Sequence, residues 1–393
     1  MRALALAIFA TSLAAVAWIY FGYPALIWLL ARRRPWPVKS SPVEPSLSVL
    51  VPAFDEEDVV EEKVRNTLFS GYPASRLEVI VASDGSTDRT EEIVARLERE
   101  HPDHVRLLRL PRQGKAAAID AAARAARGEV LVLTDANALL ATGALHHLVA
   151  PFADPEVGGV CGRKRLRSSH RSERGADAVE KGEGLYWRYD QWVKAQESRA
   201  VCVFAADGAL YALRRELYVP MADPAQADDI AISARVVLQG WRLVWAPEAV
   251  VWEEAPEEGA AELRRKVRVT NHSVRALWNL GPALWGSGFY SVQLLSHKFF
   301  RHLVPFFLLA LMAAHVALAA SSPVFAALLV PHLGFYALAA AGMLLRRAPA
   351  GRARLLSVPY YFTLVNLAAL LGVVSILRGE RRRAWNPRRG LET

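Results

Sequence analysis

An uncharged apolar stretch near the start of the chain limits its possible folds more than any other feature. Residues 3–31 contain no Asp, Glu, Lys or Arg. About 20 apolar residues are enough for a helix to cross a bilayer, and a signal-peptide core is shorter than this stretch. Three further apolar stretches follow at 303–320, 324–345 and 355–377. The sequence therefore predicts an integral membrane protein with a retained N-terminal anchor.

The net charge of +9 gathers beside these apolar stretches. The basic groups are Arg32–Arg34 and those within 264–268, 346–354 and 378–389. Lys and Arg beside membrane spans mark the cytoplasmic side and contact anionic lipid. We therefore expect a lipid bilayer as a partner, a bacterial-type inner (plasma) membrane as the location, and a cytoplasmic segment after residue 34. No nucleic-acid partner is expected, because the sequence contains no helix-turn-helix, zinc or aromatic-basic RNA motif.

The charges at the two ends of the chain conflict with a simple topology. Three crossings after a cytoplasmic segment would place the arginine-rich tail at 379–393 on the outer side. That contradicts the positive-inside tendency. Either one apolar stretch is re-entrant or the number of crossings differs, and the sequence leaves both open.

Strand-like and helix-like segments alternate in the first half of the region at 40–262. Strands are expected at 47–54, 77–86, 105–111 and 129–137, with helices at 56–71, 88–101 and 114–128. This alternation predicts an α/β fold with a doubly wound, mostly parallel sheet, which binds ligands at the carboxyl ends of its strands. Successive strands end in acids, namely Asp55 and Glu56, then Asp84, then Asp135. These acids therefore mark the expected ligand site.

The second half of this region is less regular. Strands are expected at 157–166, 242–254 and from 208, and helices at 172–198 and 227–241. The segment after residue 262 mixes basic residues and Trp with apolar residues, a pattern typical of interfacial helices. The expected domains are an anchor at 1–34, a cytoplasmic sheet domain at 40–262, amphipathic interfacial helices at 263–302, transmembrane helices at 303–378 and a basic tail at 379–393.

Asp135-Ala136-Asn137 follows an apolar strand. A carboxylate at such a place is costly unless something binds it, and metal-dependent sugar transferases often carry Asp-x-Asp there. Magnesium sites accept amide oxygens and often use only one or two carboxylates with substrate phosphates. We therefore interpret Asp135 and Asn137 as a working Mg²⁺ or Mn²⁺ site that depends on phosphate groups of a substrate. A decayed site and a plain turn are the alternatives.

The order of motifs in this region resembles the family-2 glycosyltransferases, with their GT-A nucleotide-sugar-binding fold. The matching segments are VPAFDEE, ASDGSTDRT, GKAAAID, LTDAN, DGALYALRRE and DDIAISARVVLQGW. The flanking apolar stretches make the chain similar to the membrane-embedded branch with the hyaluronan, cellulose and poly-N-acetylglucosamine synthases. The resemblance implies an inverting hexosyltransferase that uses a UDP-sugar and a divalent cation.

The resemblance also implies roles for nucleotide-binding residues. Pro52, Asp55, Glu56 and Asp84 would line the uridine pocket, although the family more often has asparagine at the position of Asp55. Asp84 could instead be a turn carboxylate. Lys115 would hold nucleotide or diphosphate, with an exposed lysine as the alternative.

For catalysis, Asp228 and Asp229 match the family's Glu-Asp pair, with Asp229 as general base. A plain helix cap is the alternative for an aspartate at this place. The acceptor would lie near Asp207 and Gly208, with Trp187 or Tyr189 stacking on a sugar. The alternative for Trp187 and Tyr189 is that they are core residues, because they lie with other aromatic residues in one helix.

The segment RRKVRV at 264–269 departs from the family pattern of the processive synthases, Gln-x-x-Arg-Trp. Arg265 and Arg268 stand at the Gln and Arg positions, while Val269 replaces the tryptophan. Diphosphate binding by Arg268 and Arg265 is compatible with this change, but processive polymerisation becomes doubtful. A basic helix that touches lipid headgroups is the alternative, and both roles can coexist.

The sequence thus predicts transfer of a sugar from a UDP-sugar to a growing polysaccharide or a lipid-linked saccharide at the cytoplasmic membrane face. One alternative is a single transfer to a polyprenyl-linked acceptor. Another, from a different class, is a non-catalytic membrane subunit that retains the fold.

Overall fold

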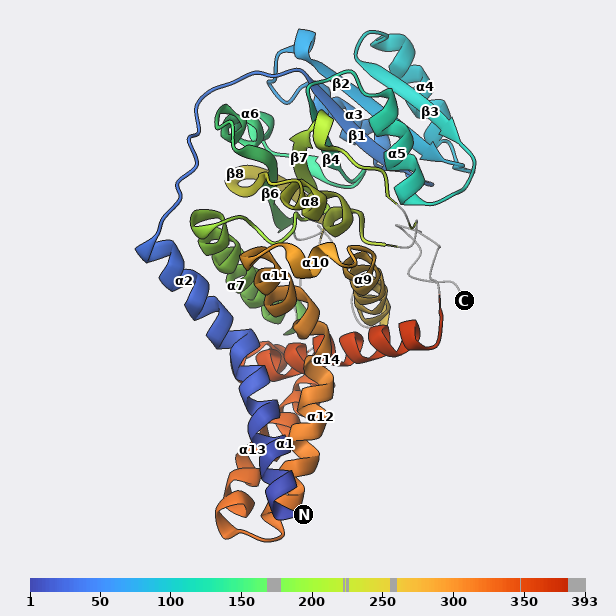
Figure 1. Ribbon diagram of the computed structural model, residues 1–393. Coiled ribbons are helices and arrows are strands. Elements are labelled where there is room, and N and C mark those ends of the chain that lie inside the picture. Colours follow the sequence, from blue (N-terminus) through green and yellow to red (C-terminus); the bar gives the residue numbers. More distant parts are fainter. Residues whose placement is uncertain (168–177, 222, 224–225, 255–259, 347, 381–393) are drawn as a thin grey trace.

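The computed structural model describes residues 1–167, 178–221, 223, 226–254, 260–346 and 348–380. It consists of a sheet domain and a group of long apolar helices, joined by shorter helices (Figure 1). Residues 172–177 of the helix expected at 172–198 lie outside the described residues, as does most of the expected basic tail.

In the part of the chain that the structure describes, the sheet has eight strands in the order β3-β2-β1-β4-β7-β6-β8-β5. The first four strands of the chain are parallel neighbours, as expected. β7 then runs antiparallel between β4 and β6, β8 is parallel to β6, and β5 is antiparallel to β8. The strands are β1 (Leu47–Ala53), β2 (Leu77–Asp84), β3 (Val105–Leu110), β4 (Val130–Thr134), β5 (Leu139–Leu140), β6 (Val157–Arg167), β7 (Leu210–Arg214) and β8 (Arg242–Glu254).

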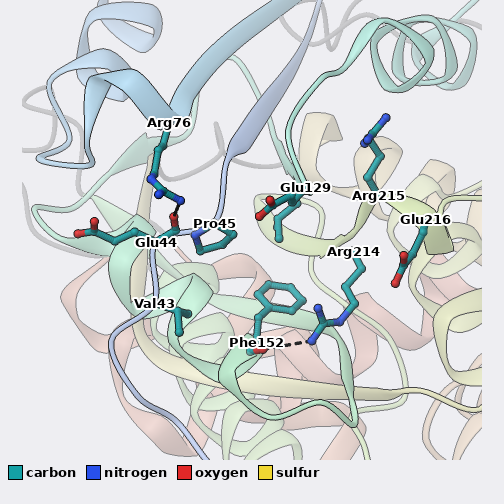
Figure 2. A pocket seen from close by; sticks show the side chains of 10 residues that line it. Val43, Glu44, Pro45, Arg76, Glu129, Phe152, Arg214, Arg215 and Glu216 are labelled. Carbon is teal, nitrogen blue, oxygen red and sulfur yellow. Dashed lines mark hydrogen bonds between the residues drawn. The ribbon is translucent and has the colours of Figure 1, made fainter.

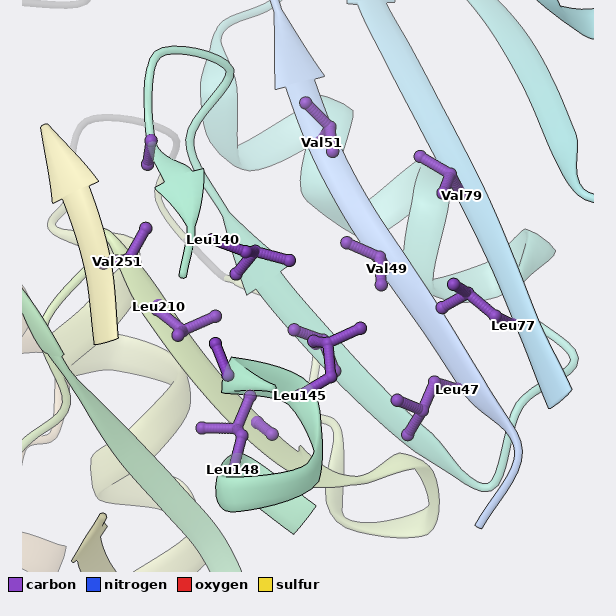
Figure 3. Close-up of a cluster of buried hydrophobic side chains, with 14 of the residues drawn as sticks. Leu47, Val49, Val51, Leu77, Val79, Leu140, Leu145, Leu148, Leu210 and Val251 are labelled. Atoms are coloured by element: carbon purple, nitrogen blue, oxygen red, sulfur yellow. The ribbon is translucent and has the colours of Figure 1, made fainter. Parts of the chain in front are cut away.

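Helices cover both faces of this sheet, because successive strand residues point to opposite sides. Val49 and Val51 of β1 lie in one core with Leu145 and Leu148, while Leu50 lies in the second core with Ile119 (Figure 3). The first core is covered by α3 (Val60–Leu68), α4 (Thr90–Glu100) and α6 (Ala144–Val149), and the second by α5 (Lys115–Ala125) and α8 (Asp228–Leu238). The doubly wound α/β fold is therefore confirmed, with a mixed rather than mostly parallel sheet.

Among the described residues, four helices are long and apolar enough to cross a membrane, as the sequence predicts. The first, Arg2–Arg33, runs through α1 (Arg2–Ala17), a π-helical turn at Trp18–Gly22 and α2 (Tyr23–Arg33). The second begins at Phe289 rather than at 303 and ends with α12 (Phe300–Ala319). The last two are α13 (Pro323–Leu344) and α14 (Arg354–Leu377).

The last of these helices differs in direction from the others. α1, α12 and α13 form the stalk of the molecule, whereas α14 runs across the end of the stalk nearest the sheet domain (Figure 1). It packs against α7 (Ala178–Ala200) and α9 (Ala260–Asn279). Asn271 donates to Ser375 Oγ at 2.7 Å, and Arg275 to the carbonyl oxygen of Glu380 at 2.7 Å. The C-terminal end of α14 therefore lies beside α9.

Candidate active site

Asp84 ends β2 and anchors the loop that leads into α5. Its buried carboxylate accepts hydrogen bonds from the backbone N–H groups of Gln113 at 2.7 Å and Gly114 at 2.9 Å, and from the Arg112 guanidinium. Gly114 has φ 101°, a backbone conformation that favours glycine. Asp84 is therefore more than a local turn carboxylate, because it fixes the loop that places Lys115.

The loop after β1 carries the other residues expected in the nucleotide pocket. Pro52 is buried in β1. Asp55 has φ 51°, and its Oδ1 accepts a hydrogen bond from the N–H of Thr87 at 2.7 Å. Glu56 is buried, and its N–H donates to Thr90 Oγ1 at 2.8 Å. These bonds join the loops after β1 and β2 at the carboxyl edge of the sheet, where α/β folds bind their ligands.

Lys115 is the first residue of α5 and joins two carboxylates from other elements. Its Nζ lies 2.8 Å from Asp135 Oδ1 and 3.2 Å from Asp228 Oδ1. Burial lowers the pKa of Lys115, but Asp135, Asp228 and Asp229 outweigh that effect and raise the pKa above its usual range. Because its side chain is 18% exposed and paired, the alternative of an exposed lysine is wrong.

Asp229 lies in the first turn of α8, beside the Asp207–Gly208 loop. A Cβ atom added to Gly208 would lie 3.9 Å from Asp229 Oδ2. Burial, and next the negative charge of Asp228, raise the pKa of Asp229 to about 6. The N-cap residue of α8 is Ala227, and no side chain caps it. Asp229 Oδ1 does accept the backbone N–H of Ile230 at 2.8 Å, so it meets the helix N-terminus as the cap alternative requires, while its raised pKa suits a base near neutral pH.

Asp207 faces two lysines that sequence reasoning did not single out. Lys164 Nζ lies 3.8 Å and Lys194 Nζ 3.9 Å from its carboxylate oxygens. Burial raises the pKa of Asp207, but the two lysines outweigh it, so the pKa is lower than usual. Lys164 also pairs with Glu253 at 3.4 Å. Asp207 is thus held ionised in a network of alternating charges.

The two aromatic residues expected at the acceptor site lie in different surroundings. The Lys164 ammonium lies 4.7 Å from the centre of the Trp187 ring, so Trp187 adjoins the Asp207 network. Tyr189 instead donates its hydroxyl hydrogen to the carbonyl oxygen of Tyr20 at 2.9 Å and packs beside Tyr23 of α2. The structure therefore places Tyr189 in the contact between α7 and the N-terminal helix, as the alternative of a core aromatic residue requires.

Arg265 and Arg268 lie on α9, the helix that follows the sheet domain. Burial, and next the nearby charge of Arg265, lower the pKa of Arg268. Among the described residues, no carboxylate pairs with Arg268. Val269 is 46% exposed. Arg268 is thus a partly buried cation that an anionic ligand could neutralise.

The family of the chain follows from a comparison with protein-family models. Residues 45–271, which include the strand-end acids, Lys115 and the α8 aspartates, match the model of "Glycosyltransferase like family 2". The chain belongs to this family. The motif order predicted this family.

Curated members of this glycosyltransferase family resemble the chain over the same region. It is 27% identical over 234 residues to the probable glycosyltransferase YdaM of Bacillus subtilis (strain 168), covering 57% of this chain and 54% of YdaM. It is 24% identical over 226 residues to the poly-beta-1,6-N-acetyl-D-glucosamine synthase of Staphylococcus aureus (strain MSSA476), covering 56% and 53%. With the beta-monoglucosyldiacylglycerol synthase of Trichormus variabilis (strain ATCC 29413 / PCC 7937), identity is 28% over 244 residues, covering 61% and 50%. The chain spans about half the length of these relatives.

A solved structure resembles this glycosyltransferase over nearly its whole length. It is the mannosyltransferase PcManGT from Pyrobaculum calidifontis in complex with GDP-Man and Mn²⁺. The TM-score is 0.69 with 27% sequence identity, and the match covers 95% of this chain and 99% of PcManGT. The expected GT-A fold is therefore confirmed.

The acids of the site fit a hard divalent cation. The carboxylates of Asp135 and Asp228 converge on one ammonium group, within 3.2 Å. Asn137 is exposed two residues after Asp135 and offers an amide oxygen. No three His, Cys, Asp or Glu side chains form a metal-binding group within the described residues. This donor set suits Mg²⁺ or Mn²⁺ held together with substrate phosphates, which supply the missing oxygens.

A cavity of about 540 Å³ opens at the other edge of the sheet. It lies where β1 and β4 begin and the antiparallel β7 ends (Figure 2). Arg76 and Arg214 already bond to backbone carbonyl oxygens there. Its labelled lining residues are Val43, Glu44, Pro45, Arg76, Glu129, Phe152, Arg214, Arg215 and Glu216. Because the acids stand at the carboxyl ends of the parallel strands, this cavity takes no part in their chemistry.

Proposed function

We propose that the protein is an inverting, metal-dependent hexosyltransferase. It transfers a sugar from a nucleoside diphosphate sugar to a saccharide or lipid-linked acceptor at the cytoplasmic face of a bacterial-type inner membrane. The observation that carries the proposal is the position of Asp229, a carboxylate with a pKa of about 6 beside Gly208 and next to the group formed by Lys115, Asp135 and Asp228.

Asp229 serves as the general base of the transfer. Its carboxylate takes the proton of the acceptor hydroxyl while the hydroxyl oxygen forms a bond to the anomeric carbon. The bond from that carbon to the diphosphate breaks on the opposite face, and its electron pair stays on the diphosphate. Attack from the opposite face inverts the anomeric configuration. Asp207 lies in the loop beside Asp229 and would hold the acceptor.

Positive charge stabilises the diphosphate as it leaves. Lys115 already lies among the strand-end acids, and Arg268 is a partly buried cation on α9. Asp135 and Asn137, with Asp228 close by, would hold Mg²⁺ or Mn²⁺, which would act as a Lewis acid on the diphosphate oxygens. Asp84, Asp55, Glu56 and Pro52 would shape the pocket for the nucleoside.

Two donors are supported by different observations. The motif resemblance supports a UDP-hexose. The structural match over 95% of the chain to a mannosyltransferase in complex with GDP-Man supports GDP-mannose as the second candidate. Both candidate donors contain a diphosphate, which would bind beside the same acids. The same transfer step therefore applies to either donor.

The acceptor class rests on two kinds of relative. One is named as a synthase of a polysaccharide and another as a synthase of a glycolipid. Val269 replaces the tryptophan of the processive synthases and is 46% exposed. We therefore favour a single transfer or a short product over a long polymer.

The charges around the helices support a cytoplasmic sheet domain. Arg32 and Arg33 end α2, Arg346 follows α13, Arg354 begins α14, and Arg378 follows α14. The connection between α13 and α14 lies toward the sheet domain, and the connection between α12 and α13 lies at the far end of the stalk (Figure 1). The far connection at 320–322 carries no charge. This distribution agrees with the positive-inside tendency.

Donor turnover tests the proposal. Purified full-length protein in detergent is incubated with UDP-glucose, UDP-N-acetylglucosamine or GDP-mannose, with Mn²⁺ or Mg²⁺, and with membrane lipid extract as acceptor. We expect one donor to be consumed, an EDTA control to abolish consumption, and a short labelled product. Nucleotide binding without turnover of any donor would favour the non-catalytic subunit, and unchanged turnover in EDTA would exclude the metal.

A further inference from the structure

Lys63 is a fully buried lysine on α3, behind the Asp135–Asn137 loop. Its Nζ donates hydrogen bonds to Thr134 Oγ1 at 2.9 Å and to the carbonyl oxygen of Ala138. Thr134 directly precedes the loop and Ala138 directly follows it. One ammonium group thus holds both ends of the segment that presents the expected metal ligands.

The charge of Lys63 is unusual for such a place. Within the described part of the chain, no carboxylate lies within ion-pair distance of its Nζ. A buried charge without a charged partner is costly, and an apolar side chain in the same face of α3 would avoid that cost. Burial lowers the pKa of Lys63 to about 7, although Asp135 and Glu253 partly oppose the shift. A role beyond packing would explain why a lysine stands there.

The hydrogen bonds of Lys63 continue to the acceptor side of the site. Thr134 Oγ1 accepts from Lys63 and donates its own hydrogen to the carbonyl oxygen of Ala209 at 2.8 Å. Ala209 follows Asp207 and Gly208, the loop beside Asp229. Two successive hydrogen bonds therefore connect α3 to the loops on both sides of the site.

A second residue of α3 supports the same segment. The side-chain amide of Asn66 donates to the carbonyl oxygen of Leu140 at 3.0 Å and accepts from its N–H at 2.7 Å. Leu140 belongs to β5, just beyond the Asp135–Asn137 loop. α3 therefore holds residues 134–140 at three points, although it contributes no group to the acid cluster.

We propose that Lys63 is a positioning residue for sugar transfer, which fixes the Asp135–Asn137 loop and the Asp207–Gly208 loop at a set separation. The role of these loops in transfer rests on the proposed function. In-line transfer requires donor and acceptor at a closely defined distance, so a loosened loop slows the chemical step more than it weakens binding.

Two substitutions and a matched control test the proposal in the full-length protein. Lys63→Met removes the ammonium and keeps an unbranched side chain, and Thr134→Val removes the hydroxyl and keeps the shape. Thr67→Val is the control, because Thr67 is also fully buried in α3 and its hydroxyl donates only within the helix, to the carbonyl oxygen of Lys63 at 2.9 Å. Amide hydrogen exchange and sugar transfer are measured for all three.

We expect Lys63→Met and Thr134→Val to speed amide exchange by about tenfold or more at 135–140 and 207–210, with smaller changes elsewhere. In transfer assays their kcat falls about 10- to 100-fold while the KM for the donor changes less than about threefold. Thr67→Val leaves exchange in both loops and kcat unchanged.

The proposal would be overturned if amide exchange in Lys63→Met and Thr134→Val rose equally over the whole sheet domain. It would also be overturned if exchange at 135–140 and 207–210 in these variants were the same as in the Thr67→Val control. If Lys63→Met does not fold, Thr134→Val decides, because it makes the smaller change. The exchange experiment needs no sugar donor, so its result stands even if wild-type protein transfers no sugar. A failure of the proposed function can therefore be distinguished from a failure of the proposed role of Lys63.

Discussion

The carboxylates of Asp135 and Asp228 share one ammonium group, the Nζ of Lys115, at 2.8 Å and 3.2 Å. They come from the end of β4 and the start of α8, so Lys115 connects the expected metal loop with the helix that carries the base. Without the lysine, two partly buried carboxylates would face each other unpaired, which is unfavourable.

Lys115→Met should therefore reduce transfer by about 100-fold or more, through loss of charge at the leaving diphosphate. We also expect weaker binding of the nucleoside diphosphate, measured by calorimetry in the presence of Mn²⁺. Lys39→Met is the control, because Lys39 is an exposed lysine outside the site. Equal diphosphate affinity and equal turnover in both variants would remove Lys115 from the site.

The pH dependence of transfer should report Asp229. A base must be deprotonated to act, and burial raises the pKa of Asp229 to about 6. The rate should therefore rise as the pH increases through about 6 and level off above it. Asp229→Asn should abolish transfer and keep nucleotide binding, whereas Asp103→Asn, at an exposed aspartate, should change neither. Turnover by Asp229→Asn with the same pH profile would show that another group is the base.

Asn137→Asp should keep activity and tighten metal dependence. The added carboxylate gives the cation a third negative charge beside Asp135 and Asp228, so less Mn²⁺ is needed to reach half of the maximal rate. A titration of turnover against Mn²⁺ measures this directly, and Mn²⁺ binding without donor gives a second readout. Loss of activity would mean that the amide has a role that a carboxylate cannot fill.

Several site residues could be predicted from the sequence because the fold brings strand ends together. Asp84 and Asp135 end parallel strands, so their placement at one edge follows from the alternation of strands and helices alone. Lys63 escaped prediction, although it stands on the buried face of α3 between Val60 and Thr67. A lysine on an apolar helix face is the signal that could have found it.

Other features depend on tertiary packing that local patterns do not encode. Lys164 lies in a strand and Lys194 in a helix, and the polar residues around them suggest exposure to solvent. Only the folded chain brings both lysines to Asp207. The direction of α14 is a second example, because hydropathy measures apolar length and not orientation. Tyr189 is a third, since the turn of α7 decides which aromatic residue faces α2.

The position of α14 predicts which side of the membrane each end of the stalk faces. In the proposed orientation Glu380, beside α9, faces the cytoplasm, and the exposed Ser321 of the far connection faces outward. A membrane-impermeant maleimide should label Ser321→Cys in intact cells, but Glu380→Cys only after permeabilisation. The background is low because Cys161 and Cys202 are both buried. Labelling of Glu380→Cys from outside would mean that α14 crosses the bilayer.

Close packing of α14 on α9 predicts a strong effect from a single methyl group. A Cβ atom added at Gly372 would lie 2.7 Å from the side chain of Thr270 and 3.1 Å from the carbonyl oxygen of Val267. Gly372→Ala should therefore push α14 away and lower the melting temperature in detergent by several degrees, as about 1–3 kcal/mol of overpacking implies. Gly334→Ala is the matched control in α13, where an added Cβ meets nothing within 4 Å. An unchanged melting temperature in Gly372→Ala would show that the contact between α9 and α14 gives way without cost, and the direction of α14 would then need another cause.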